Sequence, residues 1–187
     1  PLGLTAGNAL EVRESVEVLA GGGPGDVVEL TLALAREMVA GAGRSDIDPA
    51  DVLADGRAMD VWRRMIRAQG GDPDAELPTA KETHHVLAPA DGVLVQLDAL
   101  AVGVAAWRLG AGRARKEDPV QAGAGVELHH KPGATVRGGE PLMTLHTDEP
   151  ERFARALEAL EGGYVIEGHV PAAGERQLVK LRSVSPG

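Results

Sequence analysis

The stretch GAGVELHHKPGATVRGGEPLMTLHTD, residues 123–148, decides the fold of the second part of the chain. Its segments GVELHHK and EPLMTLHTD alternate with the period of two that is typical of β-strands, and the Pro-Gly and Gly-Gly pairs between them predict turns. Strand alternation sends His129 and Lys131 to one face and His130 to the other, which does not favour one shared metal ion. We therefore interpret His129, His130 and Lys131 as the end of a strand, with no catalytic role.

Strand and helix signals continue on both sides of this stretch. Residues 84–98 predict two short strands around a Pro-Ala-Asp-Gly turn, and residues 98–110 predict a buried, Ala-rich helix. An amphipathic helix is expected at 149–163. YVIEGHV (164–170) and QLVKLRSV (177–184) predict the closing strands.

The first third of the chain predicts helices. Residues 8–41 have apolar positions at helical spacing and are interrupted by GGGPGD, so two helices are expected there. Residues 46–71 predict a third helical stretch, with Pro49 at its first position. Asn8 and Glu11 have the layout of a capping box, three residues apart. The residues expected to cap these helices are Asn8, Asp26 and Asp48.

The composition argues against several classes of partner. The chain has 187 residues, a net charge of −9, four aromatic residues and no cysteine. Acidic charge and few aromatic side chains disfavour nucleic acid and anionic membranes, and thiolate zinc sites and disulfides are excluded. No apolar run approaches the ~20 residues that a membrane helix needs. A cytoplasmic location is the expectation.

The glycine-rich stretches do not form a recognisable phosphate cradle. GGGPGD lies between helices and lacks the Lys-Ser/Thr pair, so it matches neither the P-loop nor the dinucleotide fingerprint. HVLAPADGVL and the later strands are also similar to lipoyl and biotinyl carrier domains. In those domains a modifiable lysine sits at a hairpin tip, where this chain has the helical stretch 99–112. Lys116 lies in ARKEDP, which does not resemble a carrier hairpin.

Two longer stretches together resemble one enzyme family. They are PLGLTAGNALEVRESVEVLAGGGPGDVVELTLALAREM (1–38) and GRARKEDPVQAGAGVELHHKPGATVRGGEPLMTLHTD (112–148). Both look like the C-terminal half of thymidine phosphorylase and the wider pyrimidine-nucleoside phosphorylase family. The resemblance implies an α+β (α/β) fold. Residues 1–75 would be a helical part of the large α/β domain, and residues 76–187 would be the C-terminal α/β-hammerhead domain.

The resemblance also implies a function for a longer parent protein. Family members are homodimeric pentosyltransferases of pyrimidine nucleoside salvage, which use inorganic phosphate to release the free base and pentose 1-phosphate. Their phosphate- and base-binding motifs lie upstream of the position of Pro1. We therefore expect this chain to contain no catalytic or cofactor-binding residue, to be inactive alone, and to need the missing N-terminal half as a partner. The alternative is a free-standing, non-catalytic hammerhead module for binding or assembly.

The resemblance implies one metal-binding feature. Some members bind a monovalent cation through a leucine carbonyl and a glutamate carboxylate, and Leu2 and Glu11 stand at the corresponding positions. Glu11 would alternatively only close the capping box on Asn8. The other ligands are outside this chain, so no bound metal is expected here.

Removing the rest of a shared core should also expose the helix face at Leu30, Leu34 and Met38.

Overall fold

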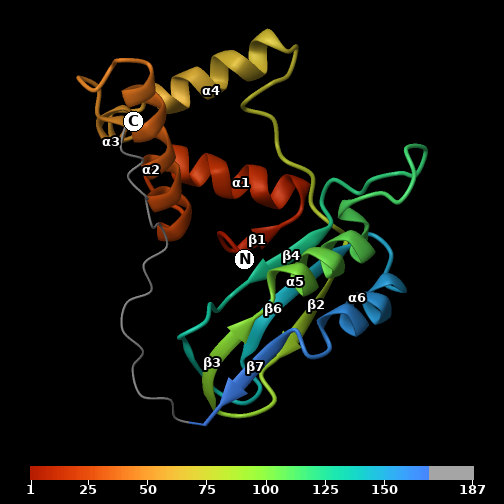
Figure 1. Ribbon diagram of the computed structural model, residues 1–187. Helices are drawn as coiled ribbons and strands as arrows, with labels where there is room; N and C mark the ends of the chain where they lie inside the picture. The colour runs from red at the N-terminus through yellow and green to blue at the C-terminus, as the bar shows by residue number, and fades with distance from the viewer. Residues whose placement is uncertain (169–187) are drawn as a thin grey trace, which may run out of the picture.

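The computed structural model describes residues 1–168, and it has two parts (Figure 1). Four helices form one group, and two small sheets with two further helices form the other. The mixture of helices and antiparallel strands confirms the predicted α+β class. Among the described residues, none of the helices has the length and apolar character needed to cross a membrane.

The first group contains the predicted helices, with one difference. Its members are α1 (Asn8–Leu19), α2 (Gly25–Gly41), α3 (Pro49–Ala54) and α4 (Arg57–Ala68). The stretch expected as one helical unit is divided between α3 and α4, because Gly56 takes a left-handed conformation with φ of 86°. Asp48 caps α3 as predicted, accepting a hydrogen bond of 3.0 Å from the N–H of Ala50.

The other two predicted caps are wrong. The N-cap of α1 is Gly7, and the Asn8 amide instead donates to the Ala111 carbonyl at 2.8 Å. The N-cap of α2 is Pro24, and Asp26 lies in the first turn. The Asn8 side chain is taken by a long-range partner, whereas Asp26 combines long-range partners with a local bond from the N–H of Val27 at 3.0 Å.

Two antiparallel sheets form the second part. The first sheet has the order β1 (Thr5–Ala6), β4 (Gly125–Leu128), β6 (Pro141–Thr147) and β2 (Glu82–Leu87). The second has the order β5 (Thr135–Val136), β3 (Gly92–Leu97) and β7 (Tyr164–Glu167). The two strands predicted in residues 84–98 are confirmed as β2 and β3, which belong to different sheets. The strand predicted at 177–184 lies outside the described residues.

Two helices pack on the sheets and enclose the core. They are α5 (Ala99–Ala106), which continues into a π-helical turn η1 (Trp107–Ala111), and α6 (Arg152–Leu160). Asp98 caps α5 by accepting from the N–H groups of Leu100 and Ala101. The fully buried apolar side chains come from these helices, from the first sheet and from the residue before β4: Ala105, Leu109, Ala124, Val126, Leu145 and Ala156.

Strand β1 ties the N-terminal residues to the sheet. Ala6 pairs with Val126, and the backbones approach so closely that an added Cβ on Gly125 would lie 2.4 Å from the Ala6 carbonyl oxygen. An added Cβ on Gly7 would lie 2.4 Å from the carbonyl oxygen of Ala124. The glycines of GNALEV and GAGV are therefore required where these two segments meet. The domain limits at 75 and 76 stay a prediction.

Candidate functional site

Residues 1–7 lie between the helices and the first sheet, and charged side chains from both parts hold them there. Lys131 Nζ donates to the Pro1 carbonyl at 2.9 Å and to the Asp26 carboxylate. Asp26 also accepts from the N–H of Gly3 at 3.1 Å. Burial raises the pKa of Asp26, but the Lys131 ammonium and the Gly3 N–H lower it more, so the net pKa lies below its ordinary value.

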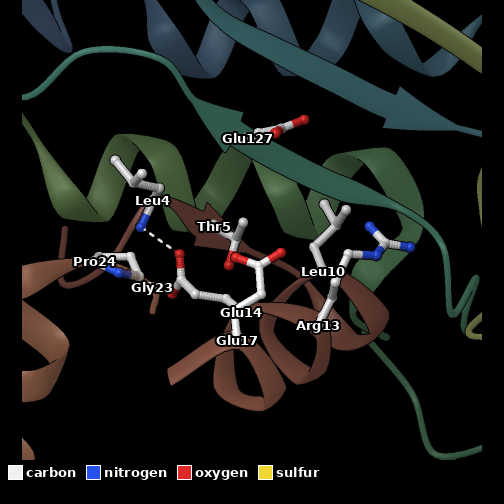
Figure 2. Close-up of a pocket in the computed structure, with 9 residues that line it drawn as sticks. All are labelled: Leu4, Thr5, Leu10, Arg13, Glu14, Glu17, Gly23, Pro24 and Glu127. Atoms are coloured by element: carbon white, nitrogen blue, oxygen red, sulfur yellow. Dashed lines mark hydrogen bonds between the residues drawn. The ribbon is translucent and has the colours of Figure 1, made fainter. Parts of the chain in front are cut away.

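Glu14 of α1 contacts the same segment from the other side. Its Oε2 accepts from the N–H of Leu4 at 2.7 Å (Figure 2). A Cβ on Gly3 would lie 2.2 Å from Glu14 Oε1, and Gly3 has φ of 69°, so the Pro-Leu-Gly segment requires glycine at this position. Burial raises the pKa of the Glu14 carboxyl.

A pocket of about 220 Å³ opens beside Glu14 (Figure 2). Its lining residues come from β1, α1, the loop before α2 and β4: Leu4, Thr5, Leu10, Arg13, Glu14, Glu17, Gly23, Pro24 and Glu127. We call this the junction pocket. Within the described residues, the buried Thr5 hydroxyl has no hydrogen-bond partner. Three carboxylates against one guanidinium give the pocket a net negative charge, which disfavours phosphate.

Neither of the two residues predicted as cation ligands, Leu2 and Glu11, lines this pocket. The Leu2 side chain is 47% exposed, and Glu11 Oε1 accepts from the N–H of Gly7 at 2.9 Å. Glu11 therefore closes on the helix start, though on Gly7 and not on Asn8. Sequence reasoning missed Glu14, although it follows the buried Leu10 by four residues and so shares that face of α1.

The histidines of the opening stretch have separate partners. His129 Nε2 lies 2.7 Å from the Thr144 hydroxyl, whereas His130 Nε2 lies 3.2 Å from the Glu140 carboxylate. His85 Nδ1 contacts the same Thr144 hydroxyl at 3.0 Å. In the part of the chain that the structure describes, no three His, Asp or Glu residues are grouped to hold a metal ion.

His146 of β6 lies beside the neighbouring strand β4. Its buried Nε2 is 3.4 Å from Glu127 Oε2 but forms no hydrogen bond within the described residues. Burial lowers the pKa of His146, although the Glu127 carboxylate acts in the opposite direction. His85 on β2 and His146 on β6 thus face groups of neighbouring strands. His129, His130 and Lys131 follow the end of β4 at Leu128, so the strand ends earlier than predicted.

Comparison with known proteins identifies the class to which this arrangement belongs. Residues 93–167 match the family described as "Pyrimidine nucleoside phosphorylase C-terminal domain". The chain therefore carries the C-terminal domain of the pyrimidine-nucleoside phosphorylase family.

The relatives extend the similarity beyond this domain. The chain is 56% identical over 171 residues to the thymidine phosphorylase of Mycobacterium tuberculosis (strain ATCC 25618 / H37Rv), covering 91% of the chain and 40% of that protein. It is 40% identical over 159 residues to the pyrimidine-nucleoside phosphorylase of Bacillus subtilis (strain 168), covering 79% of the chain and 37% of that protein. It thus spans about two fifths of the length of these relatives.

Proposed function

We propose that this chain supplies the C-terminal portion of a pyrimidine-nucleoside phosphorylase of the cytoplasm. The reaction transfers the pentosyl group of a pyrimidine nucleoside to inorganic phosphate, giving the free base and pentose 1-phosphate. The observation that carries the proposal is the 56% identity to a thymidine phosphorylase across 91% of the chain. This similarity includes residues outside the matched C-terminal domain.

The chain alone is not expected to catalyse this reaction. The sugar becomes more cationic in the transition state, and the leaving base gains negative charge, so donors have to be held around phosphate and base. The junction pocket instead has the acidic groups of Glu14, Glu17 and Glu127. The phosphate- and base-binding groups therefore belong to the part of the relatives that this chain does not span.

An exposed apolar surface on the first helices supports the proposal that the N-terminal portion of the enzyme packs against them. On α2, Leu34 is 55% exposed and Met38 is 74% exposed, whereas Leu30 is half-buried. An almost wholly apolar groove of about 360 Å³ runs between the helices, lined in part by Val18, Leu32 and Leu53. Apolar patches of this kind mark protein interfaces. The N-terminal portion of the enzyme would cover this surface, and the complete protein would act as a homodimer.

A monovalent cation in the complete enzyme would be held beside residues 1–5. Carbonyl and carboxylate oxygens are suitable ligands, and the Leu2 carbonyl remains the proposed backbone ligand together with the Glu11 carboxylate. We add Glu14 to this proposed set, because its carboxylate contacts Leu4 and lines the same pocket as Thr5, whose hydroxyl has no hydrogen-bond partner within the described residues. The cation would supply positive charge that offsets the acidic pocket and fixes this loop.

The test is phosphorolysis of thymidine and uridine, followed by ultraviolet absorbance. The 187-residue chain is measured beside the product of the complete reading frame, with a denaturing gel to exclude a second fragment. Activity in the complete product alone is expected. Activity in the short chain would place the catalytic groups in residues 1–187, and activity in neither would favour a non-catalytic module.

The cation proposal has its own measurement in the complete product. Potassium dependence is compared for Glu11→Gln, Glu14→Gln and the exposed control Glu29→Gln. A cation ligand should raise the potassium concentration needed for half-maximal rate, and the control should not. Unchanged dependence in both Glu11→Gln and Glu14→Gln would remove these carboxylates from the site.

A further inference from the structure

A further pocket, of about 370 Å³, lies in the part of the chain that contains the sheets. It is formed by η1, the loop that follows it, and α6, and we call it the arginine pocket. The side chains that give it its chemical character are Trp107, Arg108, Arg113, Asp118, Arg152 and Arg155. Its volume is within the range of about 300–1,000 Å³ that small-molecule sites occupy.

The charge of this pocket is opposite to that of the chain. Four guanidinium groups and one carboxylate line it, in a protein with a net charge of −9. Arg108 and Arg152 have carboxylate partners, Glu158 at 3.4 Å and Glu149 at 2.8 Å. Arg113 and Arg155 are exposed and have no carboxylate partner within the described residues. The pocket therefore offers two uncompensated guanidinium groups to an anion.

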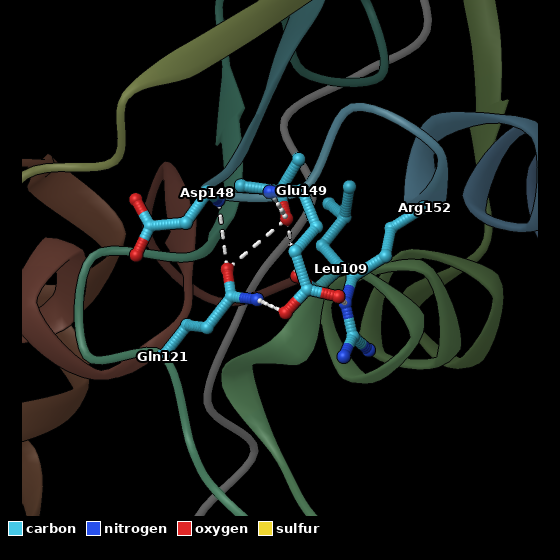
Figure 3. A network of polar contacts seen from close by, with 6 residues as sticks. Leu109, Gln121, Asp148, Glu149 and Arg152 are labelled. Carbon is cyan, nitrogen blue, oxygen red and sulfur yellow. Dashed lines mark hydrogen bonds and ion pairs between the residues drawn. The ribbon is translucent and has the colours of Figure 1, made fainter.

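A hydrogen-bond network fixes the position of Arg152 (Figure 3). Its Nε donates to Glu149 Oε2, and Glu149 Oε1 accepts from Gln121 Nε2 at 2.7 Å. Gln121 Oε1 in turn accepts from the N–H of Asp148 at 2.8 Å and from the buried hydroxyl of Thr147 at 3.1 Å. Because only Nε of Arg152 is used in this network, its terminal nitrogens stay available to a ligand.

Two further hydrogen bonds order the walls of the pocket. Arg108 Nη1 donates to the carbonyl of Arg155 at 2.6 Å, which joins η1 to α6. Arg113 Nη1 donates to the Lys116 carbonyl at 3.1 Å within the loop. These bonds order the pocket before a ligand arrives, which lowers the entropy lost on binding.

Trp107 provides a flat apolar wall beside the arginines. Its side chain is 42% exposed, and a Cβ on Gly112 would lie 2.8 Å from the ring atom Cδ1. The indole therefore fits in this position because Gly112 has no side chain. An exposed indole next to guanidinium groups can stack a planar ring, since bases stack favourably on aromatic side chains.

We propose that the arginine pocket binds a nucleoside monophosphate, with the phosphate on Arg113 and Arg155 and the base against Trp107. Guanidinium groups bind phosphate through paired, charge-assisted hydrogen bonds, which explains several arginines around one small cavity. The indole adds recognition of a planar ring that inorganic phosphate lacks. The inference is independent of the proposed phosphorolysis.

The test is isothermal titration calorimetry of the full chain at low salt, with uridine 5′-monophosphate, uridine and inorganic phosphate as probes. Arg113→Ala/Arg155→Ala should weaken binding of the monophosphate at least about tenfold, because two charge-assisted contacts are lost. The control Arg44→Ala/Arg67→Ala removes the same charge from exposed ion pairs of the helical part and should leave the affinity within about twofold. Circular dichroism verifies that each variant is folded.

Two further variants separate the phosphate from the ring. Trp107→Ala should weaken binding of the monophosphate about tenfold and leave inorganic phosphate unchanged. Arg113→Lys/Arg155→Lys retains the charge and should bind the monophosphate with an affinity between those of the wild type and the Ala variant. Uridine binding as tightly as its monophosphate, equal affinities for the Arg113/Arg155 and control variants, or no heat at millimolar monophosphate would each overturn the proposal.

Discussion

Lys131, just beyond β4, donates to the carboxylate of Asp26 in the first turn of α2, 105 residues earlier in the chain. Both side chains are largely buried, with 30% of Lys131 and 15% of Asp26 exposed. Because Lys131 also binds the Pro1 carbonyl and Asp26 also binds the Gly3 N–H, this pair joins the helices, the N-terminal segment and the sheet. The pair thus forms the polar centre of the junction.

Removing the ammonium from this pair should destabilise the chain. Lys131→Met leaves the Asp26 carboxylate partly buried without its cation, at a cost of about 3 kcal/mol in the free energy of unfolding. Urea denaturation measures the change, with the exposed Lys81→Met as the control. If both variants unfold at the same urea concentration, the pair does not stabilise the fold. Asp26→Asn/Lys131→Met should lose less than Lys131→Met alone, because no uncompensated charge remains.

The same pair predicts a loss of stability in acid. The pKa of Asp26 is lower in the folded chain than its ordinary value of 3.8, so the unfolded chain binds a proton first as the pH falls. The stabilisation is present above pH 3.8 and is lost as the pH falls through the folded-state pKa. Urea titrations between pH 5 and 2.5 should show a smaller decline for Asp26→Asn than for the wild type. Parallel curves for the two proteins would contradict this prediction.

The raised pKa of Glu14 predicts that its contribution to stability has the opposite dependence on pH. Burial raises the pKa of its carboxyl above the ordinary value of 4.5, so the folded chain holds the proton more tightly than the unfolded chain. Its contribution to stability therefore falls as the pH rises from 4.5 through the folded-state pKa. Glu14→Gln should remove this decline while keeping an oxygen acceptor for the Leu4 N–H. Glu29→Gln, on an exposed helix position, should leave the decline unchanged when stability is measured from pH 4 to 7.

Local signals predicted the helices and most of the strands, because apolar spacing and turn residues act within a few positions. They did not predict β1, since a strand of two residues has no periodicity and depends on its pairing with β4. The caps at Asn8 and Asp26 were wrong for a related reason. The partners Ala111 and Lys131 lie about a hundred residues away, and the tertiary fold decides between them and the local N–H groups.

The candidate site was predicted less completely than the fold. The resemblance pointed to the Pro-Leu-Gly segment as a functional region, and the structure places a pocket beside it. Glu11 was chosen because it stands at the position of the family's glutamate ligand, and this reasoning did not consider Glu14. Glu14 lies on the helix face of the buried Leu10 and lines the junction pocket, whereas Glu11 does not line it. Lys131 was predicted to end a strand, whereas β4 ends at Leu128, and its ion pair with Asp26 depends on the position of α2.

The junction between β1 and β4 supplies the last prediction. Gly125→Ala would place a Cβ 2.4 Å from the Ala6 carbonyl oxygen, in a pair of strands that cannot separate without losing their hydrogen bonds. We expect a loss of about 1–3 kcal/mol in the free energy of unfolding. The matched control is Gly103→Ala, in the middle of α5, where an added Cβ meets no atom within 4 Å. That substitution should stabilise the chain by up to about 1 kcal/mol, because alanine favours the helix. Equal effects of the two substitutions in urea denaturation would show that the close approach of β1 to β4 does not constrain residue 125.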